Sequence, residues 1–367
     1  MRDSLPIMGT LEWARAICPK SMLNGPCGGV REDHSCEANR ELPCPYLSVL
    51  DLLPWRGATA TNTSATKLQP KTASALEAAL CRGEFVVIAE AYTPDTADLT
   101  LLIEAYAAFK HKIHAVNIAE HALATPHTST LAAATLFKRA GIDAIINLTC
   151  RDRNRIGLQG EVLGAAALDI DNVFCVTGDH PVLGDHPNAK AVFDLDSIEL
   201  IKTVKGLCDG SMLSGRRLER SPALLIGAAA NPFSHPVHLQ AERVAAKVRA
   251  GARLIQTQAI FDIDGFGAFV AQLESYGVFD EAFLIAGVAV VTSLEGARWL
   301  QREVPGARVP ADMIAKLEKL APLERRRAGI NHAREMIERL EALKHVHGVL
   351  LFPLHGDVSS LAELLER

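Results

Sequence analysis

Several features that would each point to a class of protein are missing from this sequence. It has no run of about 18 or more apolar residues, so no membrane span is expected. Its net charge of −5 leaves no overall basic surface, so nucleic acid is not an expected partner. The N-terminal stretch MRDSLPIMGTLEWARAICPKS lacks the apolar core and the small-residue cleavage site of a secretory signal. We therefore expect a cytoplasmic protein with reduced thiols.

Two nucleotide-binding signatures are also missing. No Gly-x-Gly-x-x-Gly follows the first expected strand and no Walker sequence occurs, which disfavours the dinucleotide-binding and P-loop folds. Apolar material is plentiful instead, because hydrophobic residues make up 49% of the 367 residues. This is enough for a substantial core, in one large domain with an appendage or in two modest domains.

Half of the eight cysteines lie near the N-terminus, at Cys18, Cys27, Cys36 and Cys44. Clustered cysteines in a reducing compartment indicate metal ligands or redox groups rather than disulfides. No Cys-x-x-Cys pair occurs, so a zinc ribbon is not indicated. Four thiolates separated by glycine and proline turns can close on a [4Fe–4S] cluster or on tetrahedral zinc. We expect one of these two, with buried structural cysteines as the alternative. The backbone N–H groups of NGPCGG slightly favour iron–sulfur.

The chain divides into three expected parts. Residues 1–56 form the cysteine-rich metal- or cluster-binding segment, and residues 57–79 form a linker whose first part is rich in Thr, Ala and Ser. Residues 80–367 alternate short β-branched runs with amphipathic stretches. The expected strands are 85–92, 114–119, 144–150, 172–178, 224–230, 254–261, 283–291 and 347–354. Near-continuous apolar strands alternating with helices predict a (β/α)8 TIM barrel, with a doubly wound open sheet as the alternative.

Polar residues recur at the carboxyl ends of these strands, where barrels place their active sites. Polar groups in apolar strands cost free energy unless they are paired or used, so this recurrence predicts a site. The residues are Glu90, Asn117, Asn147, Thr149, Asp179, Asn231, Gln258 and Thr292.

Two loops add to this expected site. Arg151, Arg153 and Arg155 follow the third strand, and a guanidinium binds phosphate in a bidentate fork, although a solvated loop with local salt bridges is the alternative. Gly-Asp-His-Pro occurs at 178–181 and again at 184–187. The first glycine turn allows close approach of backbone to a ligand, with Asp179 pointing into the barrel mouth.

Taken together, these pieces resemble methylenetetrahydrofolate reductase, a flavoprotein family. The matching stretches are AEAYTP, LTCRDRNR, TGDHPVLGDHP with VFDLDS, GAAANP and GARLIQTQAIFD, which span residue 85 to about 300. The N-terminal segment, with its NGPCGG and later cysteines, is similar to a small cysteine-rich domain that accompanies some of these reductases. That domain usually follows the barrel or is a separate subunit, whereas here it precedes the barrel.

The resemblance implies roles for individual residues. Glu90 matches the general acid, which assists protonation at folate N10 as the five-membered ring opens to an iminium ion. Asp179 matches an aspartate between flavin and pterin that stays ionised and stabilises the cation. Gln258 matches a glutamine that contacts folate. Leu294 lies near the place where some members stack an aromatic residue on nicotinamide or folate, so an electron partner other than a pyridine nucleotide becomes more credible.

The resemblance also implies a flavin site, with FAD favoured and FMN as the alternative. Asn147 stands where a bacterial member has a flavin-contacting histidine, and Lys247 is placed to reach a phosphate, unless it is a solvated helix lysine. The residues expected to bind the flavin are Asn117, Asn147, Thr149, Arg151, Arg153, Thr177, Gly178, Asp179, Phe193, Asp194, Asn231 and Lys247.

The sequence therefore predicts a flavin-dependent reductase that interconverts 5,10-methylene- and 5-methyl-tetrahydrofolate by hydride transfer at flavin N5, in either direction. The electron partner is NAD(P)H or a redox protein, and the resemblance implies a homo-oligomer. Two alternatives stay open. One is a non-catalytic folate-binding subunit of a C1-transfer complex, and the other is a pterin-dependent methyltransferase on the same barrel.

Overall fold

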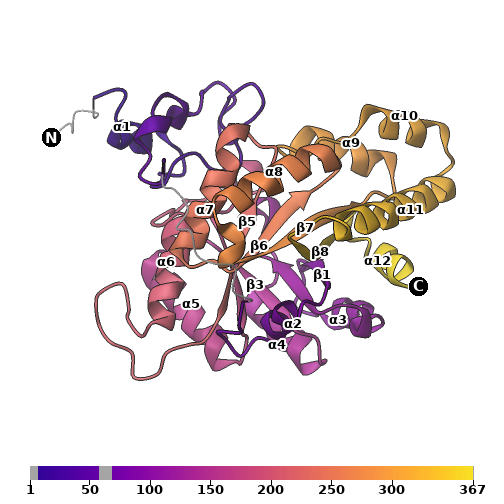
Figure 1. The fold of residues 1–367 in the computed structure, drawn as a ribbon, viewed down its shortest axis with the longest axis horizontal. Coiled ribbons are helices and arrows are strands. Elements are labelled where there is room, and N and C mark those ends of the chain that lie inside the picture. The colour runs from indigo at the N-terminus through magenta and orange to yellow at the C-terminus, as the bar shows by residue number, and fades with distance from the viewer. Residues whose placement is uncertain (1–6, 58–67, 367) are drawn as a thin grey trace.

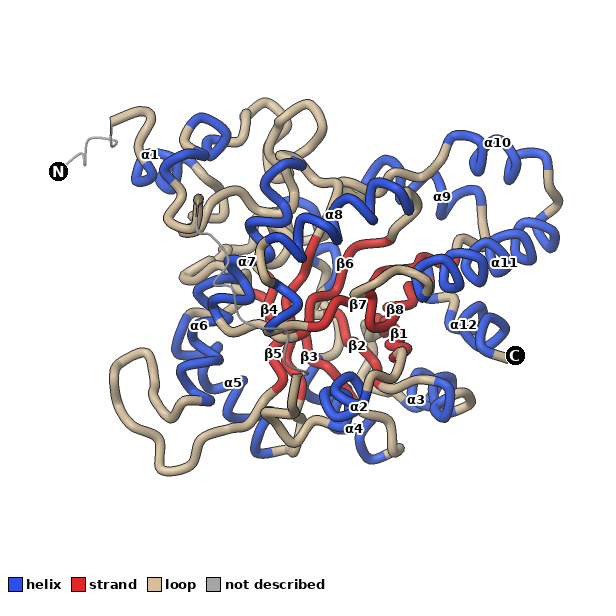
Figure 2. The backbone as a smooth tube through the Cα atoms, viewed as in Figure 1, coloured by secondary structure: helices blue, strands red, loops and turns tan. Residues whose placement is uncertain are grey.

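A computed structural model describes residues 7–57 and 68–366 of the chain. Eight parallel strands close into a barrel in sequence order, so the predicted (β/α)8 fold is confirmed and the open sheet is excluded (Figures 1 and 2). The strands are β1 (Val86–Tyr92), β2 (Ala115–Ala119), β3 (Ala144–Thr149), β4 (Asn172–Val176), β5 (Leu225–Ala230), β6 (Leu254–Ala259), β7 (Phe283–Val290) and β8 (Val346–Pro353).

Helices surround the barrel and connect its strands (Figure 2). They are α1 (Leu11–Ile17), α2 (Ala75–Arg82), α3 (Thr100–Ala107), α4 (Thr130–Arg139), α5 (Arg155–Ala167), α6 (Ser197–Cys208), α7 (Gln240–Ala250), α8 (Ile263–Ser275), α9 (Leu294–Glu303), α10 (Ala311–Lys319), α11 (Pro322–Glu341) and α12 (Val358–Leu365). In the described part of the chain, no helix is long and apolar enough to cross a membrane.

The strands read as nearly continuous apolar runs because both of their faces are buried. The outward faces pack against the helices in one large cluster that includes Val116, Phe137 and Leu284. The inward faces fill the barrel towards its amino-terminal end with side chains such as Ile145 and Phe174. This inner core is solid rather than a pore, as in other barrels of this size.

Helix α2 closes the amino-terminal end of the barrel. Its residues Leu76, Ala79 and Leu80 belong to the same buried cluster as the inward side chains of the strands. It begins at Ala75, inside the range predicted to be a linker, while residues 58–67 of that range lie outside the described residues.

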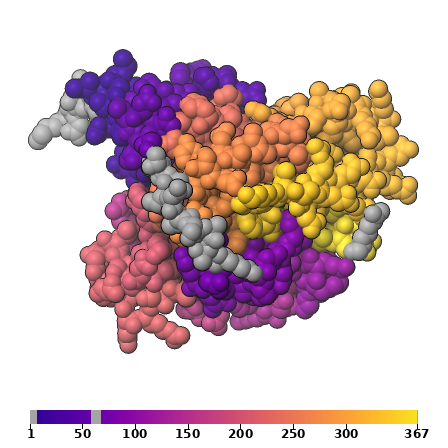
Figure 3. Space-filling model, viewed as in Figure 1, coloured from indigo at the N-terminus to yellow at the C-terminus, as the bar shows by residue number. Residues whose placement is uncertain are grey.

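Residues 7–57, which we call the N-terminal segment, pack against α6 and α7 at the other end of the molecule (Figures 1 and 3). Buried Tyr46 and Trp55 share a cluster with Ile198 of α6 and Ala246 of α7. The carboxylate of Asp196, at the N-cap of α6, accepts hydrogen bonds from the backbone N–H groups of residues 23 and 24 at 3.0 and 2.7 Å. The segment is therefore joined to the barrel by apolar packing and by a buried carboxylate.

Candidate functional site

The carboxyl ends of the strands open into a cavity of about 730 Å³. Its size is in the range usual for sites that bind cofactors and small substrates. The cavity lies at the end of the barrel where enzymes of this fold place their chemistry. The predicted site residues that line it are Glu90, Asn117, Asn147, Thr149, Arg151, Thr177, Gly178, Asp179, Asn231, Lys247 and Gln258.

Glu90 is a buried carboxyl group that lines the cavity. It stands opposite Asn117 in the β1–β2 pairing, is 6% exposed, and accepts a hydrogen bond at 2.6 Å from the Asn117 side-chain amide. Burial raises the pKa of Glu90 to about 8, and this amide hydrogen bond only partly opposes the shift. The carboxyl is therefore protonated near neutral pH and can donate a proton to a bound molecule.

Asp179 lies on the turn after β4, which begins at Gly178 with a φ of +90°. A Cβ at position 178 would lie 2.9 Å from Cβ of Thr149, so glycine allows the turn to rest against β3. The Asp179 carboxylate accepts a hydrogen bond from the Leu123 backbone N–H at 3.2 Å. The pKa of Asp179 lies above its ordinary value, because burial and the nearby Glu37 raise it more than Lys20, Arg151 and the Leu123 N–H lower it. Two carboxyl groups with different surroundings thus face one cavity.

A β-bulge in β6 presents two glutamines to the cavity. The pairing with β7 shifts register between Gln256 and Ala259, and the Thr257 hydroxyl accepts a hydrogen bond from the Gly287 N–H at 2.9 Å. A Cβ at position 287 would lie 2.6 Å from the Gln258 carbonyl oxygen, so the strands approach this closely only at glycine. The bulge leaves Gln256 buried and Gln258 exposed, and both line the cavity. Bulges often re-aim side chains beside active sites in this way.

Several buried polar atoms around the cavity have no hydrogen-bond partner within the described residues. They are Oδ1 of Asn117, Asn147 and Asn231, both amide atoms of Gln256, and Nε of Arg243. Such atoms cost free energy when buried, and native proteins satisfy nearly all of them. Their concentration around one cavity indicates a polar ligand that supplies the missing partners.

Two cations on α7 face the cavity one helical turn apart. Arg243 and Lys247 are 7% and 6% exposed, and Lys247 Nζ donates a hydrogen bond to the Ala229 carbonyl oxygen at 2.5 Å. Burial and the neighbouring Arg243 lower the pKa of Lys247 to about 7. Two like charges buried on one helix face are unfavourable without an anion, so this wall suits a phosphate.

Four predicted site residues lie outside the cavity lining. Arg153 donates a hydrogen bond to the buried Glu120 carboxylate at 2.7 Å. Asp194 forms an ion pair with Arg155 at 2.7 Å, and this pairing lowers the pKa of Asp194 to about 2. Phe193 is buried and stacks with the His180 ring at 6.1 Å.

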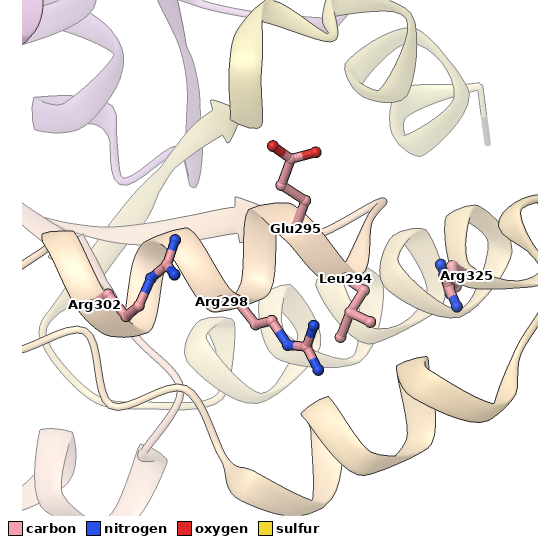
Figure 4. A pocket seen from close by; sticks show the side chains of 5 residues that line it. All are labelled: Leu294, Glu295, Arg298, Arg302 and Arg325. Carbon is pink, nitrogen blue, oxygen red and sulfur yellow. The ribbon is translucent and has the colours of Figure 1, made fainter.

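Leu294, the fourth, begins α9 and lines a separate, smaller pocket of about 380 Å³ with Glu295, Arg298, Arg302 and Arg325 (Figure 4). Another expected strand-end residue, Thr292, donates a hydrogen bond to the Asp357 carboxylate at 3.2 Å and also lies outside the main cavity lining.

The four N-terminal cysteines do not support the predicted cluster or zinc site. Within residues 7–57 and 68–366, no group of three or more His, Cys, Asp and Glu side chains is placed to hold a metal ion. Cys18, Cys27 and Cys44 join an apolar cluster, and burial raises the pKa of each of these thiols.

Some cavity residues were missed from the sequence. Lys20 and Glu37 reach the cavity from the N-terminal segment, and Gln256, Arg243 and Trp299 reach it from the barrel. Gln256 carried a signal, because it lies two residues before Gln258 near the carboxyl end of the same expected strand, where barrels place their sites. Arg243 also carried one, since it precedes Lys247 by one helical turn. Lys20 and Glu37 carried none.

Two family models match the chain. Residues 75–364 match the model described as methylenetetrahydrofolate reductase, and residues 10–72 match the model described as methylene-tetrahydrofolate reductase C terminal. The resemblance of the barrel to this family is thereby confirmed, and the N-terminal segment matches a second domain of such reductases, while its expected cysteine-rich character as a metal-binding domain stays a prediction.

Two solved structures align with this chain, and the first of them shows the same fold. An uncharacterized protein from Clostridium thermocellum, described as binding two copies of 5-methyl-5,6,7,8-tetrahydrofolic acid, aligns with a TM-score of 0.57 and 14% identity, covering 79% of this chain and 96% of its own. A 2,3-dimethylmalate lyase of the PEP mutase/isocitrate lyase superfamily aligns with a TM-score of 0.44 and 12% identity, covering 80% and 86%. At such identities a likeness concerns the fold alone.

Proposed function

Because the chain belongs to the methylenetetrahydrofolate reductase family, we propose that it is a flavin-dependent enzyme that interconverts 5,10-methylene- and 5-methyl-tetrahydrofolate. The observation that carries this proposal is that buried Glu90, whose pKa is raised, and Asp179 line one cavity together with amide atoms that lack a partner among the described residues. The folate-binding protein from Clostridium thermocellum shares the barrel fold and adds a folate precedent for it.

Glu90 is the proposed general acid. Its carboxyl holds a proton at neutral pH because the apolar strand disfavours the charged form. With one carboxyl oxygen held by Asn117, the group has a fixed orientation in the cavity. In the reductive direction it donates a proton to the folate nitrogen that leaves the one-carbon unit, and in the oxidative direction it accepts that proton back.

Asp179 is the proposed electrostatic partner of the folate cation. The turn at Gly178 places it at the cavity, and the cations of Lys20 and Arg151 favour its ionised form. A carboxylate beside a developing iminium charge stabilises the transition state more than the neutral ground state. Gln258, exposed at the β6 bulge, has an amide that can donate to and accept from a pterin edge.

Other groups of the same cavity fit a flavin. The unpaired oxygens of Asn117 and Asn147 suit the N–H groups of an isoalloxazine ring, and Arg243 with Lys247 suits its phosphate. When bound, a flavin supplies hydride acceptance and donation at N5. The residues of this chain would hold its ring and its phosphate and exclude water around Glu90.

An anaerobic visible spectrum tests the proposal. The purified chain, reconstituted with FAD or with FMN, is recorded before and after 5-methyl-tetrahydrofolate is added. We expect the flavin band to bleach in the wild type and in Glu84→Gln, a control in which an exposed glutamate paired with Arg82 is neutralised.

Glu90→Gln is the matched variant for the acid. It should keep the bound-flavin spectrum but bleach about 10²- to 10⁴-fold more slowly, as for the loss of a general acid. If the wild type binds folate but neither FAD nor FMN bleaches, the proposed enzyme function is wrong. The chain is then a non-catalytic folate-binding subunit.

A further inference from the structure

The turn that carries Asp179 is held from outside the barrel. Lys20 Nζ, from the N-terminal segment, donates a hydrogen bond to the Gly178 carbonyl oxygen at 2.7 Å. The Glu37 carboxylate, from the same segment, accepts one from the His180 backbone N–H at 3.3 Å. These two groups belong to the peptide units immediately before and after Asp179. The N-terminal segment therefore holds the backbone on both sides of that residue.

Lys20 and Glu37 also form an ion pair with each other, and both line the cavity. The Lys20 side chain is 5% exposed and the Glu37 side chain is 10% exposed. A buried ion pair contributes little to net stability, because desolvation of the two charges offsets their attraction. A pair that lines a cavity and bonds to the backbone on both sides of Asp179 is better explained by a role at the site.

The charges around Asp179 are few and identifiable. Lys20 and Glu37 face it from the N-terminal segment and Arg151 faces it from the loop after β3, while η4 (Ala122–Ala124) contributes the Leu123 N–H. At the Asp179 carboxylate the two charges of the N-terminal segment act in opposite directions, because Lys20 lowers its pKa and Glu37 raises it. Both groups also bond to the backbone of the turn and so act on the position of Asp179.

The N-terminal segment is itself fixed to the barrel, so it can serve as a support. Glu242 of α7 accepts a hydrogen bond from the Gly57 N–H at 2.6 Å and forms an ion pair with Arg56. Asp196 holds the backbone of residues 23 and 24 near the middle of the segment. Lys20 lies close to this anchored stretch in sequence, and a displaced segment would release the turn.

We propose that Lys20 is a positioning residue of the active site, which together with Glu37 holds the Gly178–His180 turn so that Asp179 faces the bound folate. The inference rests on the proposed function for the role of Asp179, but the contact with the turn can be tested without folate. The N-terminal segment then completes the site although it carries no catalytic residue.

Hydrogen exchange of the full-length, ligand-free chain tests the contact. In Lys20→Met and in Glu37→Gln, amides of residues 178–183 should exchange at least about tenfold faster than in the wild type, because local opening becomes easier. Lys344→Met is the control, since Lys344 forms an exposed ion pair with Glu274 at 2.7 Å on another part of the surface. Unchanged exchange of the turn in both test variants would overturn the inference.

Kinetics of folate-dependent flavin bleaching tests the role. Lys20→Met should lower kcat on the order of 10- to 100-fold, as for a misplaced catalytic group, with a smaller change in KM and unchanged flavin affinity. Lys20→Ala should recover part of this loss when ethylammonium is added, because the truncated side chain opens space at the cavity; a purely folding role would give no such rescue.

The two proposals fail differently. A kcat within twofold of the wild type in both Lys20→Met and Glu37→Gln, in a wild type that bleaches normally, overturns the role of Lys20 and leaves the proposed function standing. A wild type that does not bleach overturns the proposed function and with it the catalytic role, whatever the exchange of the turn shows.

Discussion

Both ends of the barrel bury polar and charged groups, but the two ends differ in how completely those groups are hydrogen-bonded. At the amino-terminal end, the carboxylate of Glu77 on α2 is fully buried and forms an ion pair with Arg253 at 2.7 Å. Its other oxygen accepts three further hydrogen bonds, from the N–H groups of residues 71 and 72 and from the Thr72 hydroxyl. Arg253 in turn donates to the Gln69 carbonyl oxygen at 3.0 Å. This network satisfies its charges within the protein.

At the carboxyl end, the equivalent groups are left incomplete. Buried amide atoms of Asn117, Asn147 and Gln256 have no partner within the described residues. Arg243 and Lys247 of α7 face the cavity, and the carboxylate that acts on both is Asp196, which caps α6. The difference indicates that the buried polar groups of the amino-terminal end stabilise the fold, whereas those of the carboxyl end bind a ligand. Burial alone would not separate the two ends, but hydrogen-bond completeness does.

The largest expected effect lies at the carboxyl end. Glu90→Gln should lower the bleaching rate about 10²- to 10⁴-fold at pH 7. The reductive rate of the wild type should fall as the pH rises through about 8, because the acid must be protonated. Stopped-flow measurement of flavin oxidation by methylene-tetrahydrofolate between pH 6 and pH 9.5 checks this, and a rate that is flat across pH 8 would contradict it.

The raised pKa of Glu90 also has a consequence for stability. A folded-state pKa of about 8 lies above the ordinary value near 4.5, so the folded chain binds more protons between these two values. The contribution of Glu90 to stability is therefore present at low pH and falls by up to about 1.4 kcal/mol per pH unit through this window. Urea unfolding checks this. As the pH rises from 5 to 8, the free energy of unfolding of the wild type should fall relative to that of Glu90→Gln.

At the amino-terminal end, the same kind of change should act on stability instead. Arg253→Met leaves the buried Glu77 carboxylate unpaired and should lower the free energy of unfolding by about 3–5 kcal/mol. Lys71→Met, which removes an exposed ion pair with Glu281, should cost about 1 kcal/mol or less. If Arg253→Met instead lost flavin binding but kept its stability, the assignment of stability to the amino-terminal end and of ligand binding to the carboxyl end would be wrong.

Lys247→Met should stabilise the chain and weaken the binding of phosphate-bearing flavins. The folded-state pKa of about 7 lies below the ordinary value of 10.5, so wild-type stability from this group is lowest below pH 7 and is regained as the pH rises towards 10.5. The gain on substitution should therefore be larger at pH 6 than at pH 9, by about 2–3 kcal/mol. Thermal melts at the two pH values, with FMN and riboflavin titrations alongside, check both parts.

The smallest expected effect is at Gln256. Replacement of its unpaired buried amide in Gln256→Leu should leave stability unchanged or raise it by about 1 kcal/mol, because a desolvation cost is removed. Ligand affinity should fall about tenfold, which equilibrium titration with flavin and with methyl-tetrahydrofolate measures. A loss of stability comparable to that of Arg253→Met would mean that the carboxyl end is as complete as the amino-terminal end.

The site was predictable where a residue's place follows from its position on a strand. Glu90, Asn117 and Asn147 occupy the ends of buried strands, and parallel strands bring their carboxyl ends together in any barrel. The loops were less predictable, because a loop side chain finds its partner through packing. Arg151 reaches the cavity, whereas Arg153, two residues later, pairs with Glu120. Both arginines belong to the same set at every second position of the loop, so the sequence did not show which one reaches the cavity.

By itself, the sequence determined the alternation of strands and helices, the barrel, the carboxyl group of Glu90 and the turn of Asp179, because hydrophobic period and glycine turns are local properties. The tertiary structure decided three things. It set the bulge through which both Gln256 and Gln258 line the cavity. It placed the four N-terminal cysteines so that, among the described residues, they are not part of a group that could hold a metal ion. It also brought Lys20 to the Gly178 carbonyl oxygen, 158 positions away in the sequence. These outcomes depend on contacts between segments far apart in the chain, and no local pattern records such contacts.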